Sequence, residues 1–261
     1  MIYTEVRYTP EFRKASTSNL RRFATDVALI AHSVRCSYLV DAISARNPMS
    51  FFSQLLQALR SKDILFSDLI HLHDPTSMQS FILNTRLLDG LGDGYGAASS
   101  KKSGDPWTTC VRLDNPPVAL ASPPDQVIQT LRNLQLAVHM RENGLLTINL
   151  PKDLTITTLV PLAAYLLEYP VALVPSSDEA ISHLSGESLH VYEAIIHGSS
   201  GSDSHTFLKF SCPAVVSDEA LQLLPAQLIR RLHSRFDSRL ADIGMSLTVQ
   251  HHTVTLDRVA L

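Results

Sequence analysis

Four side chains able to bind a metal ion gather at the ends of two apolar runs. Asp41 ends the first run, Asp74 directly follows the second, and His71 and His73 lie two apart within it. If the two runs are parallel neighbouring strands, both carboxylates emerge at one sheet edge, where open α/β sheets bind ligands. Two carboxylates placed there could hold Mg²⁺ or Mn²⁺ and activate water for phosphoester hydrolysis.

A simpler interpretation of the same residues needs no metal. Asp74 precedes Pro75, a common turn pair, and Asp41 is able to cap a turn over 42–47. His71 and His73 share one strand face and could chelate a transition metal with Asp74, but the sequence contains no H-E-x-x-H spacing. Asp41 and Asp74 are therefore catalytic or metal-binding candidates, with His71 and His73 as further metal candidates.

The glycine-rich segment 88–106 matches neither nucleotide-binding motif. Its glycines at 92, 94 and 96 alternate, whereas G-x-G-x-x-G requires a different spacing and a following helix. Lys102 and Ser103 resemble the end of a P-loop, but Lys101 occupies the position of its second glycine. A nucleophile elbow, G-x-S-x-G, is also missing. We therefore expect no cofactor, and we interpret 88–106 as a mobile loop.

Two groups of basic residues lie within expected helices. One group lies near the N-terminus, and the other consists of Arg230, Arg231, Arg235 and Arg239 in the last helix. Residues 171–220 hold seven acidic residues against one base, Lys209. The last helix is thus predicted either to neutralise this acidic segment or to present a charged surface to a protein partner.

Composition narrows the classes of partner. The 261 residues are 45% hydrophobic and 18% charged, with a formal net charge of -3, which argues against a dedicated nucleic-acid binder. The longest apolar stretch, Leu159–Pro175, is interrupted by Pro161, Glu168 and Pro170 and is too short to span a bilayer. We expect a soluble protein of the cytoplasm or nucleus that binds neither nucleic acid nor membrane, with Cys36, Cys110 and Cys212 as free thiols.

Apolar spacing predicts alternating helices and strands along most of the chain. Helices are expected over 11–32, from Pro48, over 125–143, over 159–167, and for about 20 residues before the C-terminal strands. Strands are expected over 34–41, 64–73, 81–84, 107–113, 145–150, 171–174, 246–250 and 253–259. An antiparallel hairpin is expected over 189–196 and 206–212, with a flexible tip at about 198–205.

These elements predict one α/β domain over 1–261, with a mixed sheet, helices on both of its faces and an antiparallel C-terminal part. The strand–helix–strand order over 145–174 predicts a parallel pair with a right-handed crossover. A division of the chain near 88–124, where loop and prolines fall, is the alternative.

Three segments carry a family resemblance: Val34–Asp41, Leu166–Ala172 and Val254–Leu261. They resemble the uncharacterised family typified by the human chromosome 1 open reading frame 74 protein. The resemblance implies a eukaryotic, soluble, single-domain protein without an assigned reaction, and it transfers no site residues. Together with the lack of a complete catalytic motif, it favours a protein that acts through partner surfaces, with the metal-dependent phosphoester hydrolase as the alternative.

Overall fold

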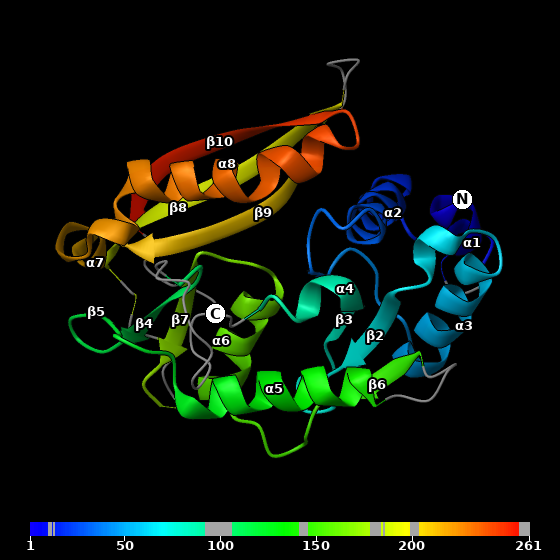
Figure 1. Ribbon diagram of the computed structural model, residues 1–261, viewed down its shortest axis with the longest axis horizontal. Helices are drawn as coiled ribbons and strands as arrows, with labels where there is room; N and C mark the ends of the chain where they lie inside the picture. Colours follow the sequence, from blue (N-terminus) through cyan, green and yellow to red (C-terminus); the bar gives the residue numbers. More distant parts are fainter. Residues whose placement is uncertain are drawn as a thin grey trace. The chain divides into compact units, whose positions relative to one another are not determined.

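The computed structural model describes residues 1–9, 12, 14–91, 106–140, 146–177, 184, 186–198 and 204–255. Helices and strands alternate along these residues, which confirms the α/β class (Figure 1). The chain divides into two compact units, Met1–Leu91 with Arg132–Leu154, and Gly92–Leu131 with Thr155–Leu261. The division falls within helix α5 (Asp125–His139). Whether the two units form one domain stays a prediction, and each unit is described by itself.

The first unit is built on a four-stranded sheet. Its strands are β1 (Ser37–Leu39), β2 (Leu69–His73), β3 (Ser80–Asn84) and β6 (Thr147–Asn149), in the order β1-β3-β2-β6. β3 runs antiparallel to both of its neighbours, and β6 runs parallel to β2. The unit also contains α1 (Ile2–Arg7), α2 (Thr17–Ala31), α3 (Pro48–Arg60), the 3-10 turn η2 (Ile64–Phe66) and α4 (Thr85–Leu88).

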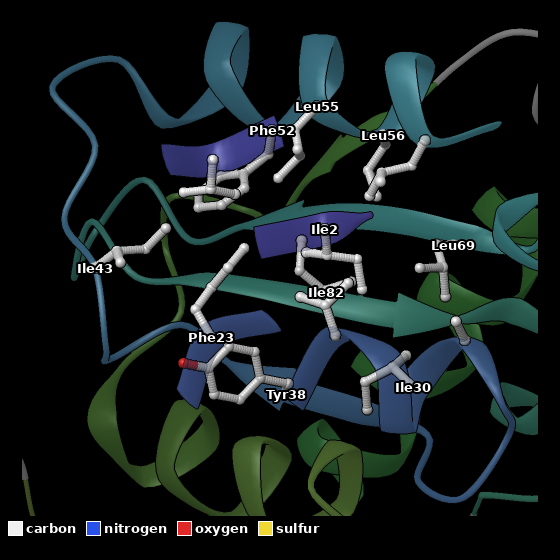
Figure 2. Close-up of a cluster of buried hydrophobic side chains, with 14 of the residues drawn as sticks. Ile2, Phe23, Ile30, Tyr38, Ile43, Phe52, Leu55, Leu56, Leu69 and Ile82 are labelled. Atoms are coloured by element: carbon white, nitrogen blue, oxygen red, sulfur yellow. The ribbon is translucent and has the colours of Figure 1, made fainter. Parts of the chain in front are cut away.

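Side-chain caps start the two long helices of this unit. The Ser16 hydroxyl accepts a hydrogen bond from the Asn19 N–H at the start of α2, and the Asn47 side chain accepts one from the Ser50 N–H at the start of α3. Pro48 occupies the first turn of α3, where its missing N–H costs nothing. Side chains from α1, α2 and α3 then converge on Tyr38, Leu69 and Ile82 of the sheet (Figure 2).

The second unit contains two three-stranded sheets. The first combines β4 (Thr109–Leu113), β5 (Val118–Ala119) and β7 (Val171–Pro175) in the order β5-β4-β7, with β4 and β7 parallel. The second is the antiparallel sheet β10-β8-β9, made of β8 (Ser188–Gly198), β9 (Ser204–Pro213) and β10 (Met245–Thr255). The pairing of β8 with β9 confirms the predicted hairpin.

Four helical elements complete the second unit: α6 (Ile156–Leu166), α7 (Ala214–Glu219), the 3-10 turn η3 (Leu221–Leu223) and α8 (Pro225–Ala241). α8 buries Leu228, Leu232, Phe236 and Leu240, in agreement with the predicted stripe. Phe236 meets Phe207 edge to face at 5.2 Å between ring centroids, which packs α8 against β9.

Two local predictions are wrong. β6 and β7 do not pair with each other around α6, because β6 joins β2 in the first unit and β7 joins β4 in the second. The expected strands 246–250 and 253–259 are one continuous strand, β10, through Thr255. The core of the predicted loop 88–106, residues 92–105, and the hairpin tip 199–203 lie outside the described residues.

Candidate functional site

The two candidate aspartates stand at the ends of strands that share a direction but are not neighbours. β1 and β2 both run antiparallel to β3, which lies between them. Two inter-strand spacings separate β1 from β2, roughly 10 Å. The Asp41 carboxylate instead lies 2.5 Å from the Arg22 guanidinium and accepts a 3.0 Å hydrogen bond from the Tyr38 hydroxyl.

Asp74 holds the turn between β2 and β3. Its side chain is buried and accepts hydrogen bonds from the backbone N–H groups of Thr76 (2.9 Å) and Ser77 (3.2 Å) and from the Ser77 hydroxyl. Both aspartates are thus engaged by protein donors. Over the part of the chain that the structure describes, no three His, Cys, Asp or Glu side chains gather closely enough to hold a metal ion. The hydrolase interpretation stays a prediction.

Removing the Asp74 side chain should destabilise this turn. We expect Asp74→Ala to lower the free energy of unfolding by about 2 kcal/mol, because two backbone N–H groups and a hydroxyl of the turn lose a charged acceptor. Asp41→Ala should cost less than about 1 kcal/mol, because Asp41 and Arg22 are each about half exposed. Urea denaturation of both variants measures the difference. Equal costs would contradict the assignment of Asp74 to the turn.

His71 is the centre of a buried polar chain across β2, β3 and β6. Its Nδ1 lies 3.1 Å from the Thr147 hydroxyl, and its Nε2 lies 3.0 Å from the Ser80 hydroxyl. Thr147 continues the chain to the Ser53 hydroxyl at 2.7 Å. Burial, and secondarily His73, lowers the pKa of His71 to about 3, so its imidazole is neutral at physiological pH.

The hydrogen-bonded group around His71 contains a serine and a histidine in contact, as catalytic serine–histidine pairs do, but a substrate cannot reach it. His71 is fully buried, and Ser80 is only 5% exposed. An imidazole with so low a pKa is also a weak general base at neutral pH. The chain therefore satisfies buried polar groups in the core. His73, also buried, keeps its Nδ1 without a hydrogen-bond partner.

Three of the four arginines predicted to form a partner surface have contacts within the second unit. Arg235 and Arg239 bind the carboxylate of Glu168, with shortest distances of 2.6 and 3.1 Å. Arg231 donates to the carbonyl oxygens of Pro106 and Trp107. Arg230 is exposed. A partner for this face stays a prediction.

Glu168, which sequence reasoning did not single out, terminates α6 in an unusual way. It has φ = +54°, and its N–H and that of Tyr169 donate to the carbonyl oxygens of Tyr165 and Ala164. These two bonds form a Schellman cap, whose left-handed position usually holds glycine. A side chain at this position costs about 1 kcal/mol or more. Glu168 is nevertheless fully buried, because its carboxylate neutralises Arg235 and Arg239.

Trp107 encloses this ion-pair cluster. Its Nε1–H donates to the Glu168 carbonyl oxygen at 3.1 Å, and its ring meets that of Phe236 edge to face. The guanidinium groups of Arg231 and Arg235 lie 5.4 and 5.0 Å from its ring centroid. This arrangement combines cation–π attraction with burial, and it fixes the start of β4 to α8 and to the end of α6.

The edge strand β10 has chemical features that the sequence analysis missed because it split the strand in two. Its eleven residues include no Asp, Glu, Lys, Arg or Pro. His251 on β10 and His190 on β8 bring two ring nitrogens, Nε2 and Nδ1, within 3.1 Å. The His251 ring also stacks on Tyr192 at 4.9 Å. Burial, followed by His190 and His252, lowers the pKa of His251.

The cysteines are buried free thiols, as predicted. Burial raises the pKa of Cys110 and of Cys212 to about 11, so neither is a ready nucleophile.

Comparisons with known proteins identify a family and no individual relative. The chain matches no curated protein and no solved structure. Within the described parts of the chain, no helix combines the length and apolarity needed to cross a bilayer. A family model, Domain of unknown function (DUF4504), matches residues 125–261, which is more than half of the chain. The chain belongs to the DUF4504 family.

Proposed function

We propose that this protein acts by binding a protein partner through the edge of β10 that no described strand covers, and that its first partner is a second copy of itself. The observation that carries the proposal is a difference in residue types between the two edge strands, β9 and β10, of the sheet β10-β8-β9. Figure 1 shows the order of these strands. β9 carries Lys209 and ends at Pro213, two devices that discourage edge-to-edge pairing. β10 has neither.

The length and composition of β10 suit strand addition. It pairs with β8 from Met245 to Thr255, about twice the usual strand length. Among the described residues, β8 is its only strand neighbour, so its other side offers backbone N–H and C=O groups to a further strand.

A second copy is the occupant that the composition of β10 favours. Two copies of β10 pairing antiparallel about a two-fold axis at Gln250 would join the two sheets into one. Because the strand contains no charged residue, no like charges would face each other across this pairing. Closed two-fold dimers are also the commonest soluble oligomers.

Lysines on the exposed positions of β10 should weaken the pairing. Thr248 and Gln250 are exposed, so the double variant Thr248→Lys, Gln250→Lys is expected to fold. Repulsion between the added ammonium groups near the axis should weaken the dimer at least about tenfold. Sedimentation equilibrium of the wild-type and variant chains measures this change.

A lysine on the opposite edge is the matched control. Thr206 on β9 is also exposed, and Thr206→Lys is expected to leave the dimer unchanged. A wild-type chain that stays monomeric at all concentrations would refute self-association, as would a dimer that is indifferent to the β10 lysines.

The family resemblance adds a finer expectation. We infer that the chain is a eukaryotic, intracellular relative of the human chromosome 1 open reading frame 74 protein. The segments quoted above and the three buried free thiols support this inference.

A further inference from the structure

His190 and His251 form a preorganised pair of imidazoles on neighbouring strands. They are not directly opposite in the register, because His190 pairs with Thr253 and His251 pairs with Tyr192. The two residues are diagonal neighbours, and their side chains reach toward each other. Nδ1 of His190 and Nε2 of His251 lie 3.1 Å apart, and the ring centroids lie 5.0 Å apart. The sequence separates these residues by 61 positions, and only the register of β8 with β10 brings them together.

Neighbouring side chains hold both rings in place. The Thr253 hydroxyl lies 3.1 Å from Nδ1 of His190, and the ring of His251 stacks on Tyr192 with an interplanar angle of 27°. Tyr192 is itself fully buried and stacks on Phe210. The stack on Tyr192 acts on the ring face of His251 and not on its Nε2. The Thr253 hydroxyl contacts the same nitrogen of His190 that faces His251, so it must turn away when a metal ion binds there.

We propose that His190 and His251 chelate one divalent transition-metal ion of the Cu²⁺–Zn²⁺ class, with water in the remaining positions. An ion about 2.0–2.1 Å from each nitrogen, across the 3.1 Å gap, would subtend an angle of about 100° at the metal. This angle lies between the square-planar and tetrahedral values. Imidazole ligands suit copper and zinc, and Cu²⁺ binds such ligands most strongly.

A metal ion can bind to the neutral imidazole pair without net release of a proton. Without metal, one imidazole donates its N–H to the lone pair of the other. When the ion enters, the donor ring moves that proton to its other ring nitrogen, so that both facing nitrogens present lone pairs. His251 is exposed and His190 is half-buried, so water reaches the ion. Both ligands belong to one chain, so the site does not require the proposed dimer.

The test is a Cu²⁺ titration of the full chain in a buffer containing glycine, which competes for weak copper sites. We expect one tight equivalent in the wild-type protein, with an electron paramagnetic resonance spectrum showing two coordinated imidazole nitrogens. His190→Ala and His251→Ala should each weaken this binding at least tenfold and remove one nitrogen from the spectrum. His251→Phe keeps a ring to stack on Tyr192 and should lose the ion equally, which separates ligation from folding.

His252 provides the matched control. It is adjacent to His251 and exposed, but it lies on the opposite face of β10. His252→Ala should bind copper like the wild-type chain. The proposal is overturned if the His190 and His251 variants retain wild-type affinity, or if His252→Ala loses as much affinity as they do.

Discussion

Replacing Glu168 with glutamine is expected to lower the free energy of unfolding by about 3 kcal/mol. The substitution removes the charge that neutralises Arg235 and Arg239, whose side chains are only 24% and 22% exposed. Breaking a buried ion pair by removing one partner costs about 3–5 kcal/mol, and the partial exposure of the arginines places this case at the lower end. Trp107, the only tryptophan of the chain, contacts the site, so its fluorescence during urea denaturation measures the loss.

An exposed control and two further variants of Glu168 separate the effect of the charge from that of the backbone. Glu219→Gln removes an exposed carboxylate and should change stability by less than about 0.5 kcal/mol. Glu168→Gly loses the carboxylate but relieves the left-handed backbone, so it should be destabilised less than Glu168→Ala by about 1 kcal/mol. If Glu168→Gln unfolds at the wild-type urea concentration, the ion pairs do not stabilise this unit.

The second large effect is a loss of stability in acid that depends on His71. In the unfolded chain an imidazole takes up a proton as the pH falls below about 6.5. In the folded chain burial keeps His71 neutral until the pH nears its lowered pKa of about 3. Stability is therefore complete above pH 6.5 and decreases as the pH falls, by about 1.4 kcal/mol per pH unit in this window.

The comparison of His71→Gln with the wild-type chain isolates this contribution. Between pH 6.5 and pH 4.5 the wild-type chain should lose about 2–3 kcal/mol more than the variant, whose amide does not titrate. Urea denaturation followed by circular dichroism at both pH values measures the two losses. His252→Gln, at an exposed position, should behave like the wild-type chain. Parallel acid losses in wild type and His71→Gln would show that His71 is not the responsible group.

Local patterns predicted most elements but not their partners. Apolar spacing placed α2, α3, α5 and α8, and Pro48 and Asp125 marked the starts of two helices. The choice of β2 for β6, and of β4 for β7, depends on tertiary packing that strand sequences do not encode locally. The same limit explains why the sequence could not decide whether the strands that end at Asp41 and Asp74 are neighbours; β3 separates them.

The residues that the sequence analysis missed lie where local sequence signals are weak. The sequence around Glu168 does not predict a left-handed cap, because the usual signal is a glycine and Glu168 occupies its position. Pro170 alone indicates that the helix ends there. The sequence analysis ended one strand at Gln250 and began the next at Thr253, although His251 and His252 between them lie within one continuous strand. Apolar and polar residues alternate from Met245 to Gln250, but Val254 is apolar where a polar residue would continue the pattern. Periodicity alone therefore does not identify the whole strand.

The strand partners of β6 and β7 determine which fragments of the chain are expected to fold in isolation. The region matched by the family model, 125–261, contains both strands. The partners of both strands, β2 and β4, lie upstream of that region. A fragment limited to 125–261 would expose two unsatisfied strand edges and the apolar surfaces beside them, a combination that promotes aggregation. We therefore expect a soluble fragment of this chain to include the residues that precede the matched region, from at least β2 onward.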